Sequence, residues 1–86
     1  MSILTLLVDD EAQIRRLVTT GLKGYGHDVL TAASGKEGLT IAAQRQPDLV
    51  ILDISLGSEP DGIEVCRRIR EWSQVPIIML SVRGED

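Results

Sequence analysis

Residues 49–53 read Leu49-Val50-Ile51-Leu52-Asp53, a continuous apolar run that ends in a carboxylate. Because apolar and polar residues do not alternate in this run, it predicts a strand that is buried on both faces, as in parallel sheets. A similar run over residues 3–8 is followed by Asp9 and Asp10. The two runs therefore predict neighbouring elements of a parallel sheet, each followed directly by acidic side chains.

Segments with helical periodicity separate the predicted strands. Apolar residues at helical spacing predict a helix over residues 11–24. Ser34 and Glu37 have the spacing of a capping box and predict the start of a second helix, which Pro47 ends. A third helix is predicted over residues 63–72, and two further strands over residues 28–32 and 76–80. This alternating order predicts an α/β fold, a doubly wound parallel sheet with right-handed crossovers and helices on both faces.

Two of the predicted helices have an apolar row that indicates their buried face. In the first helix the row is Ile14, Leu17, Val18 and Leu22, and in the third it is Ile63, Cys66 and Ile69. Cys66 is accordingly predicted to be a core residue. His27 is predicted to be an exposed loop residue, and Trp72 to pack near a helix end.

Composition limits the class of protein. The 86 residues are 43% hydrophobic and carry a net charge of −4, which disfavours direct binding to nucleic acid or to an anionic membrane. No apolar stretch reaches the roughly 18 residues of a membrane span, and the N-terminus lacks the basic region of a secretory signal. The single cysteine excludes an internal disulfide framework. These features favour a cytoplasmic protein.

Polar residues follow three of the four predicted strands. Ligands of open α/β sheets bind at the carboxyl ends of the strands, so Asp9, Asp10, Asp53 and Ser81 are expected at one edge. Each of these residues taken alone is more commonly a loop or cap residue, and the combination carries the prediction. Clustered carboxylates repel one another, and Mg²⁺ would compensate their charge. A carboxylate can also attack phosphorus to give an aspartyl phosphate.

At this point the sequence resembles the receiver domains of two-component response regulators. The resemblance covers essentially the whole chain, and the combination of motifs is highly specific. The matching segments are residues 7–11, Leu-Val-Asp-Asp-Glu; residues 47–53, Pro-Asp-Leu-Val-Ile-Leu-Asp; Asp61-Gly62; and residues 75–81, Val-Pro-Ile-Ile-Met-Leu-Ser.

The resemblance implies a phosphorelay function and a role for each matching residue. Asp53 would accept a phosphoryl group from a histidine kinase, and Asp9 and Asp10 would hold Mg²⁺ together with Asp53 and the backbone carbonyl of Ser55. Ser81 would be the switch hydroxyl. The implied sheet is flavodoxin-like and CheY-like, with strand order 2-1-3-4-5. Residues 70–83 are similar to the class with winged-helix DNA-binding outputs, so the chain is expected to control transcription and not to be an enzyme.

The chain departs from the family pattern in two places. The loop after Asp53 is one residue longer than the usual form, and Gly57 stands where proline is common. The family's phosphate-contacting lysine is absent from this sequence, because Lys23 and Lys36 are in the wrong places. We therefore expect residues 1–86 to form a receiver domain that is incomplete at its C-terminus. We also expect it to self-associate through the edge strand, residues 76–80, or to continue into a missing C-terminal region.

Of two other readings of the sequence, the first remains open and the second is disfavoured. One is a pseudo-receiver or scaffold that binds partners without being phosphorylated, which the missing lysine favours and the intact acids disfavour. The other is a haloacid-dehalogenase-type phosphatase, which also uses an aspartate after a strand. That family requires a second aspartate two residues after the nucleophile, where this sequence has Ser55.

Overall fold

The computed structural model describes residues 2–80, which form one parallel sheet and three helices. The sheet has the order β2-β1-β3-β4, and all of its neighbouring strands are parallel. This confirms the predicted fold class and the order 2-1-3-4. The strands are β1 (Leu4–Val8), β2 (Asp28–Ala32), β3 (Leu49–Asp53) and β4 (Ile77–Leu80), and the helices are α1 (Ala12–Gly24), α2 (Gly35–Arg45) and α3 (Gly62–Arg70).

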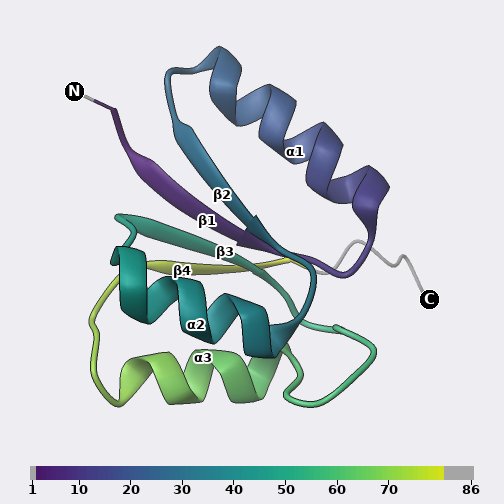
Figure 1. Ribbon diagram of the computed structural model, residues 1–86, viewed down its shortest axis with the longest axis vertical. Helices are drawn as coiled ribbons and strands as arrows, with labels where there is room; N and C mark the ends of the chain where they lie inside the picture. Colours follow the sequence, from purple (N-terminus) through teal and green to yellow (C-terminus); the bar gives the residue numbers. More distant parts are fainter. Residues whose placement is uncertain (1, 81–86) are drawn as a thin grey trace.

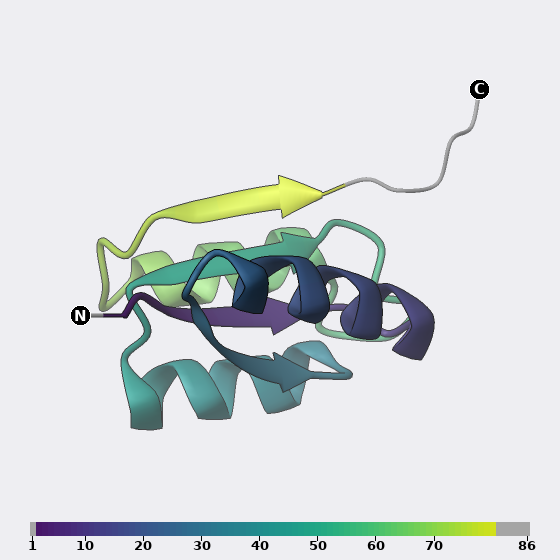
Figure 2. The same ribbon diagram turned by 90° about the horizontal axis from the view of Figure 1, so that it is seen from above.

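The helices lie on both faces of the sheet, as predicted. Helix α1 packs on β1 and β2 from one face, while α2 and α3 lie side by side on the other face (Figure 1). All four strands point the same way, so the turn into α1 and the β3–α3 loop leave the sheet at the same end (Figure 2). Within residues 2–80, no helix is long and apolar enough to cross a membrane.

The hydrophobic core lies between the sheet and the pair α2 and α3. Alternate residues of β1 and β3 point into it, and Val65 and Ile69 of α3 close it from the opposite side. Residues 5–8 of β1 and 50–53 of β3 are all buried, so both faces of these two strands are covered. This explains why they were recognisable as continuous apolar runs. The buried strand residues of this core are Leu6, Val8, Val50 and Leu52.

The start of α2 confirms half of the predicted capping box. The Ser34 hydroxyl accepts a hydrogen bond from the Glu37 N–H at 3.1 Å, as an N-cap should. The Glu37 carboxylate, however, accepts from the N–H of Ala33 at 2.9 Å and not from that of Ser34. The side chain therefore satisfies a donor one residue before the N-cap, and it still ties the loop to the first turn.

The buried face of α3 differs from the predicted row. Ile63 is 58% exposed, whereas Val65 is fully buried and Cys66 only half-buried. The helix begins one residue earlier than predicted, with Asp61 as its N-cap and Gly62 packed against β3. The core therefore receives the face that carries Gly62, Val65 and Ile69.

Two further sequence predictions changed in the structure. Leu17 of α1 is 69% exposed, so only Ile14, Val18 and Leu22 of its predicted stripe are partly buried. His27 is half-buried, and its Nδ1 shares a hydrogen bond of 3.0 Å with the hydroxyl of the buried Thr5. The prediction of an exposed loop residue was therefore wrong for His27. Trp72 is half-exposed beyond the end of α3.

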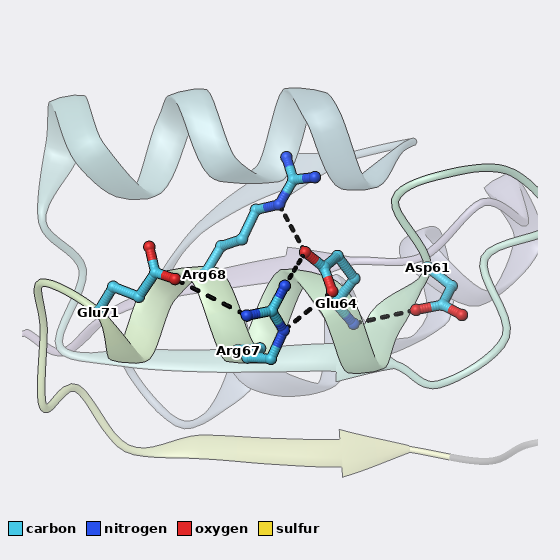
Figure 3. A network of polar contacts seen from close by, with 5 residues as sticks. All are labelled: Asp61, Glu64, Arg67, Arg68 and Glu71. Atoms are coloured by element: carbon cyan, nitrogen blue, oxygen red, sulfur yellow. Dashed lines mark hydrogen bonds and ion pairs between the residues drawn. The ribbon is translucent and has the colours of Figure 1, made fainter.

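The outer surface of α3 carries a network of charged side chains (Figure 3). Oε2 of Glu64 accepts hydrogen bonds from Nη2 of Arg67 at 2.6 Å and from Nε of Arg68 at 2.9 Å. Nη1 of Arg67 also forms an ion pair with Oε2 of Glu71 at 3.8 Å. The two arginines hold the pKa of the Glu64 carboxyl below its usual value. Because the network is exposed to solvent, its contribution to stability is expected to be small and sensitive to salt.

Candidate functional site

The ends of β1 and β3 bring the three predicted acids together. Val8 is paired with Leu52 in the sheet, so the residues that come next, Asp9 and Asp53, lie side by side. Ligand oxygens of Asp9, Asp10 and Asp53 all lie within 4.8 Å of one another. The meeting of three carboxylates at one sheet edge, which the sequence predicted, is therefore present in the structure.

The two inner carboxylates are buried and only half satisfied. Asp9 is fully buried and Asp53 is 2% exposed. One oxygen of each accepts a backbone hydrogen bond, Asp9 Oδ1 from Glu11 N at 2.9 Å and Asp53 Oδ1 from Ser55 N at 3.1 Å. The other oxygen of each, Oδ2, is buried with no hydrogen-bond partner among residues 2–80. Unpaired buried carboxylate oxygens are costly, so this edge is suited to a positively charged or hydrogen-bonding ligand.

The electrostatics of Asp9 also indicate that this edge is suited to a positively charged ligand. Burial raises the pKa of the Asp9 carboxyl above its usual value, and the negative charges of Asp53, Asp10 and Glu11 raise it further. The hydrogen bond from the Glu11 N–H opposes this increase. A cation at this edge would favour the ionised carboxylate.

The donor set fits a hard divalent cation. Carboxylate oxygens are ligands that Mg²⁺ prefers, and it usually takes few of them, completing its shell with water and phosphate oxygens. The exposed Asp10 and the two unpaired oxygens of Asp9 and Asp53 offer such a set. Ser55 lies two residues after Asp53, at the start of the loop. Its N–H donates a hydrogen bond to the Asp53 carboxylate and so orients it.

The remaining residues considered for this site from the sequence are Ser81 and the two lysines of the chain. Leu80, the last residue of β4, is paired with Asp53. Ser81 follows it but lies outside residues 2–80, and so its position is not described. Lys23 is in the last turn of α1, and Lys36 is in the first turn of α2, after the edge strand β2.

Sequence reasoning missed two residues that contact the acidic turn. Arg15 donates a hydrogen bond from Nη1 to the main-chain carbonyl of Asp9 at 2.8 Å. Gly57, in the β3–α3 loop, lies against the carboxylate of Asp10. Arg15 could have been suspected from its place in the first turn after the acids, off the apolar stripe of α1. For Gly57 the sequence showed only an unusual loop residue.

Known proteins resemble this chain in both sequence and fold. The profile of the family described as response regulator receiver domain matches residues 5–86. The transcriptional regulatory protein AfsQ1 of Streptomyces coelicolor is 47% identical over 81 residues, which are 94% of this chain and 36% of that protein. The KDP operon transcriptional regulatory protein KdpE of Escherichia coli is 49% identical, with the same coverage of 94% and 36%. The chain thus spans about a third of the length of these relatives.

Two solved structures show the same arrangement of strands and helices. The BeF3-activated N-terminal receiver domain of Klebsiella pneumoniae RstA superposes with a TM-score of 0.87 and 31% identity, over 96% of this chain and 70% of that one. The N-terminal domain of a response regulator receiver protein from Methanoculleus marisnigri gives a TM-score of 0.86 and 35% identity, over 98% and 70%.

Proposed function

Because this chain belongs to the response regulator receiver domain family, we propose that it accepts a phosphoryl group on Asp53 from a histidine kinase. Mg²⁺ would be bound by Asp9, Asp10, Asp53 and the backbone carbonyl of Ser55. The observation that carries this proposal is the pair of buried, unpartnered oxygens on Asp9 and Asp53. Such oxygens are costly in a fold with no ligand to receive, and they are useful in one that binds a cation and a phosphoryl group.

The surroundings of Asp53 suit it to act as the nucleophile. The Ser55 N–H holds Oδ1 at 3.1 Å, which fixes the orientation of the carboxylate and leaves Oδ2 free to attack. Attack forms an oxygen–phosphorus bond and breaks the phosphorus–nitrogen bond of a phosphohistidine, so the histidine leaves with its electron pair. The products are an aspartyl phosphate and a histidine.

Asp9 and Asp10 would hold the cation beside the nucleophile. Their position at the end of β1 places both next to the end of β3. When bound, Mg²⁺ would screen the charge between the carboxylate and the incoming phosphoryl oxygens and would orient the attack. Ser81 follows the residue paired with Asp53, and we propose that its hydroxyl donates a hydrogen bond to a phosphoryl oxygen.

The domain would act as a signalling switch and not as an enzyme with an external substrate. Its relatives AfsQ1 and KdpE are transcriptional regulatory proteins, and the aligned part is about a third of each. We infer that the receiver, formed by residues 1–86, controls a winged-helix DNA-binding output in the cytoplasm. We also infer that the receiver itself makes no contact with nucleic acid or membrane, which agrees with its net charge of −4.

Intact-mass measurement after incubation with acetyl phosphate and Mg²⁺ tests this function. We expect the mass of the wild type to increase by one phosphoryl group and the mass of Asp53→Asn to stay unchanged. The control Asp28→Asn, at an exposed aspartate in β2, should show the same increase as the wild type. Full labelling of the Asp53→Asn protein would refute the assignment of the phosphoacceptor. If the wild type took up no phosphoryl group from acetyl phosphate or from a panel of phosphorylated kinases, the pseudo-receiver reading would be favoured.

A further inference from the structure

The β3–α3 loop brings its backbone into close contact with the acidic cluster at Gly57. Gly57 has a φ of +77°, in the left-handed region that glycine adopts without a side-chain penalty. A Cβ atom built on Gly57 would lie 3.0 Å from Oδ2 of Asp10. This separation is shorter than an ordinary carbon–oxygen contact, so a side chain at position 57 requires either the loop or the carboxylate to move.

The loop is held on both sides of Gly57 and has little freedom to retreat. Leu56, the residue before it, is 2% exposed and belongs to the hydrophobic core. On the other side, the main-chain carbonyl of Pro60 lies directly against Gly35, with no room for a Cβ between them. At the end of the loop, the N–H of Gly62 donates a hydrogen bond to the carbonyl of Ile54 at 3.2 Å.

Asp10 is the partner that can move. It is exposed, in contrast to the buried Asp9 and Asp53. An exposed carboxylate can rotate about its side-chain torsions at small cost, whereas moving Leu56 would disturb the packed core. Crowding at position 57 would therefore turn the Asp10 carboxylate away from the place where it meets the other two acids.

We propose that Gly57 is a positioning residue for the cation site, because the bare backbone at this position leaves room for the Asp10 carboxylate to face Asp9 and Asp53. The inference rests on the proposed function, since it assumes that these acids bind Mg²⁺. It assigns Gly57 two separate properties, a left-handed backbone and a missing side chain. Only the missing side chain acts on Asp10.

A matched glycine elsewhere in the chain separates these two properties. Gly26 also has a positive φ, +87°, but a Cβ built there would meet nothing within 4 Å. Gly57→Ala and Gly26→Ala thus introduce a comparable backbone strain, and only Gly57→Ala crowds a carboxylate. Titration with Mg²⁺ alone, followed by amide chemical shifts, should show about a tenfold loss of affinity in Gly57→Ala. Gly26→Ala should keep the wild-type affinity.

Mg²⁺ titration in an Asp10→Ala background tests whether the effect passes through Asp10. We expect Gly57→Ala to lower the Mg²⁺ affinity in the wild-type background and to leave the already reduced affinity of Asp10→Ala nearly unchanged, because the carboxylate that it would displace is gone. Equal losses in the two backgrounds would overturn the proposal, as would equal Mg²⁺ affinities of Gly57→Ala and Gly26→Ala. If Gly57→Ala fails to fold, Gly57→Asn serves by the same criteria, because asparagine tolerates the left-handed region.

Mg²⁺ binding by the wild-type protein distinguishes failure of the proposed function from failure of the role assigned to Gly57. A wild-type protein that binds no Mg²⁺ would remove the proposed function and the inference together. A wild-type protein that binds Mg²⁺, with Gly57→Ala unchanged, would remove only the role of Gly57.

Discussion

The carboxylate of Asp9 is buried with one hydrogen bond and three negatively charged neighbours. Its pKa in the folded protein is raised, mainly by burial. Between the ordinary pKa of an aspartate and this raised value, the folded state therefore binds more protons than the unfolded state. Stability then falls as the pH rises through this window, and the penalty persists at neutral pH.

Asp9→Asn should consequently stabilise the metal-free protein at neutral pH. The amide keeps the size of the side chain and removes the buried charge. Urea unfolding in the presence of a chelator, at several pH values, measures the effect. The gain should vanish at a pH well below the ordinary aspartate pKa, where the wild-type carboxyl is protonated in both states. A gain that did not depend on pH would show that charge is not its cause.

Arg15 stabilises the turn that carries the acids. Its guanidinium donates to the Asp9 carbonyl at 2.8 Å and places a positive charge next to the cluster. Arg15→Ala should lower the free energy of unfolding by about 1 kcal/mol. Arg16→Ala, at the exposed neighbouring position, is the matched control and should change it much less. Denaturant titration of the two variants makes the comparison, and equal losses would contradict the role of Arg15.

At the scale of single residues, the sequence predicted the positions of the three acids but not the contacts of the residues around them. Asp9, Asp10 and Asp53 could be placed because each directly follows an apolar strand, and parallel strands end at the same edge. The contacts of Arg15 and Gly57 depend on a side-chain direction and on a loop path. Neither property has a periodic signal in the sequence.

At the scale of elements, α3 depends on its N-cap. The Asp61 carboxylate accepts from the N–H of Glu64 at 3.0 Å and so satisfies a donor in the first helical turn. Asp61→Ala should cost about 1 kcal/mol of stability, the usual cost of losing such a cap. Asp61→Ser should retain most of it, because serine also caps. Thermal or urea unfolding of the two variants tests this, and equally large losses would assign Asp61 some other role.

Element boundaries also show where periodicity misleads. The spacing of Ile63, Cys66 and Ile69 is helical and predicted a buried row. The packed face includes Gly62, because the helix starts so close to β3 that a Cβ on Gly62 would overlap the Asp53 carbonyl. A glycine that faces the sheet has no hydropathy signal. The apolar pattern alone therefore assigned Ile63 to the buried face of α3 in place of Gly62.

At the scale of the whole molecule, helices cover the two faces of the sheet unequally. Helices α2 and α3 together cover one face of the sheet, whereas α1 packs on β1 and β2 of the other (Figure 1). Within residues 2–80, β4 is paired on one side only, with β3. Ile78 in the middle of β4 is 48% exposed. The apolar run of residues 76–80 predicted a strand, whereas its edge position was expected from the strand order of the family that the sequence resembles.

A polypeptide of these 86 residues should therefore self-associate through β4. An unpaired apolar edge strand offers free backbone groups to a second chain, and the exposed Ile78 adds apolar surface beside it. Light scattering after size-exclusion chromatography should show an average mass that rises with protein concentration. Ile78→Lys places a charge on the edge and should shift the protein toward the monomer. Ile63→Lys, at an isoleucine that is 58% exposed but distant from β4 in the sequence, should not. A monomer at all concentrations, or the same shift from both variants, would show that β4 does not mediate association.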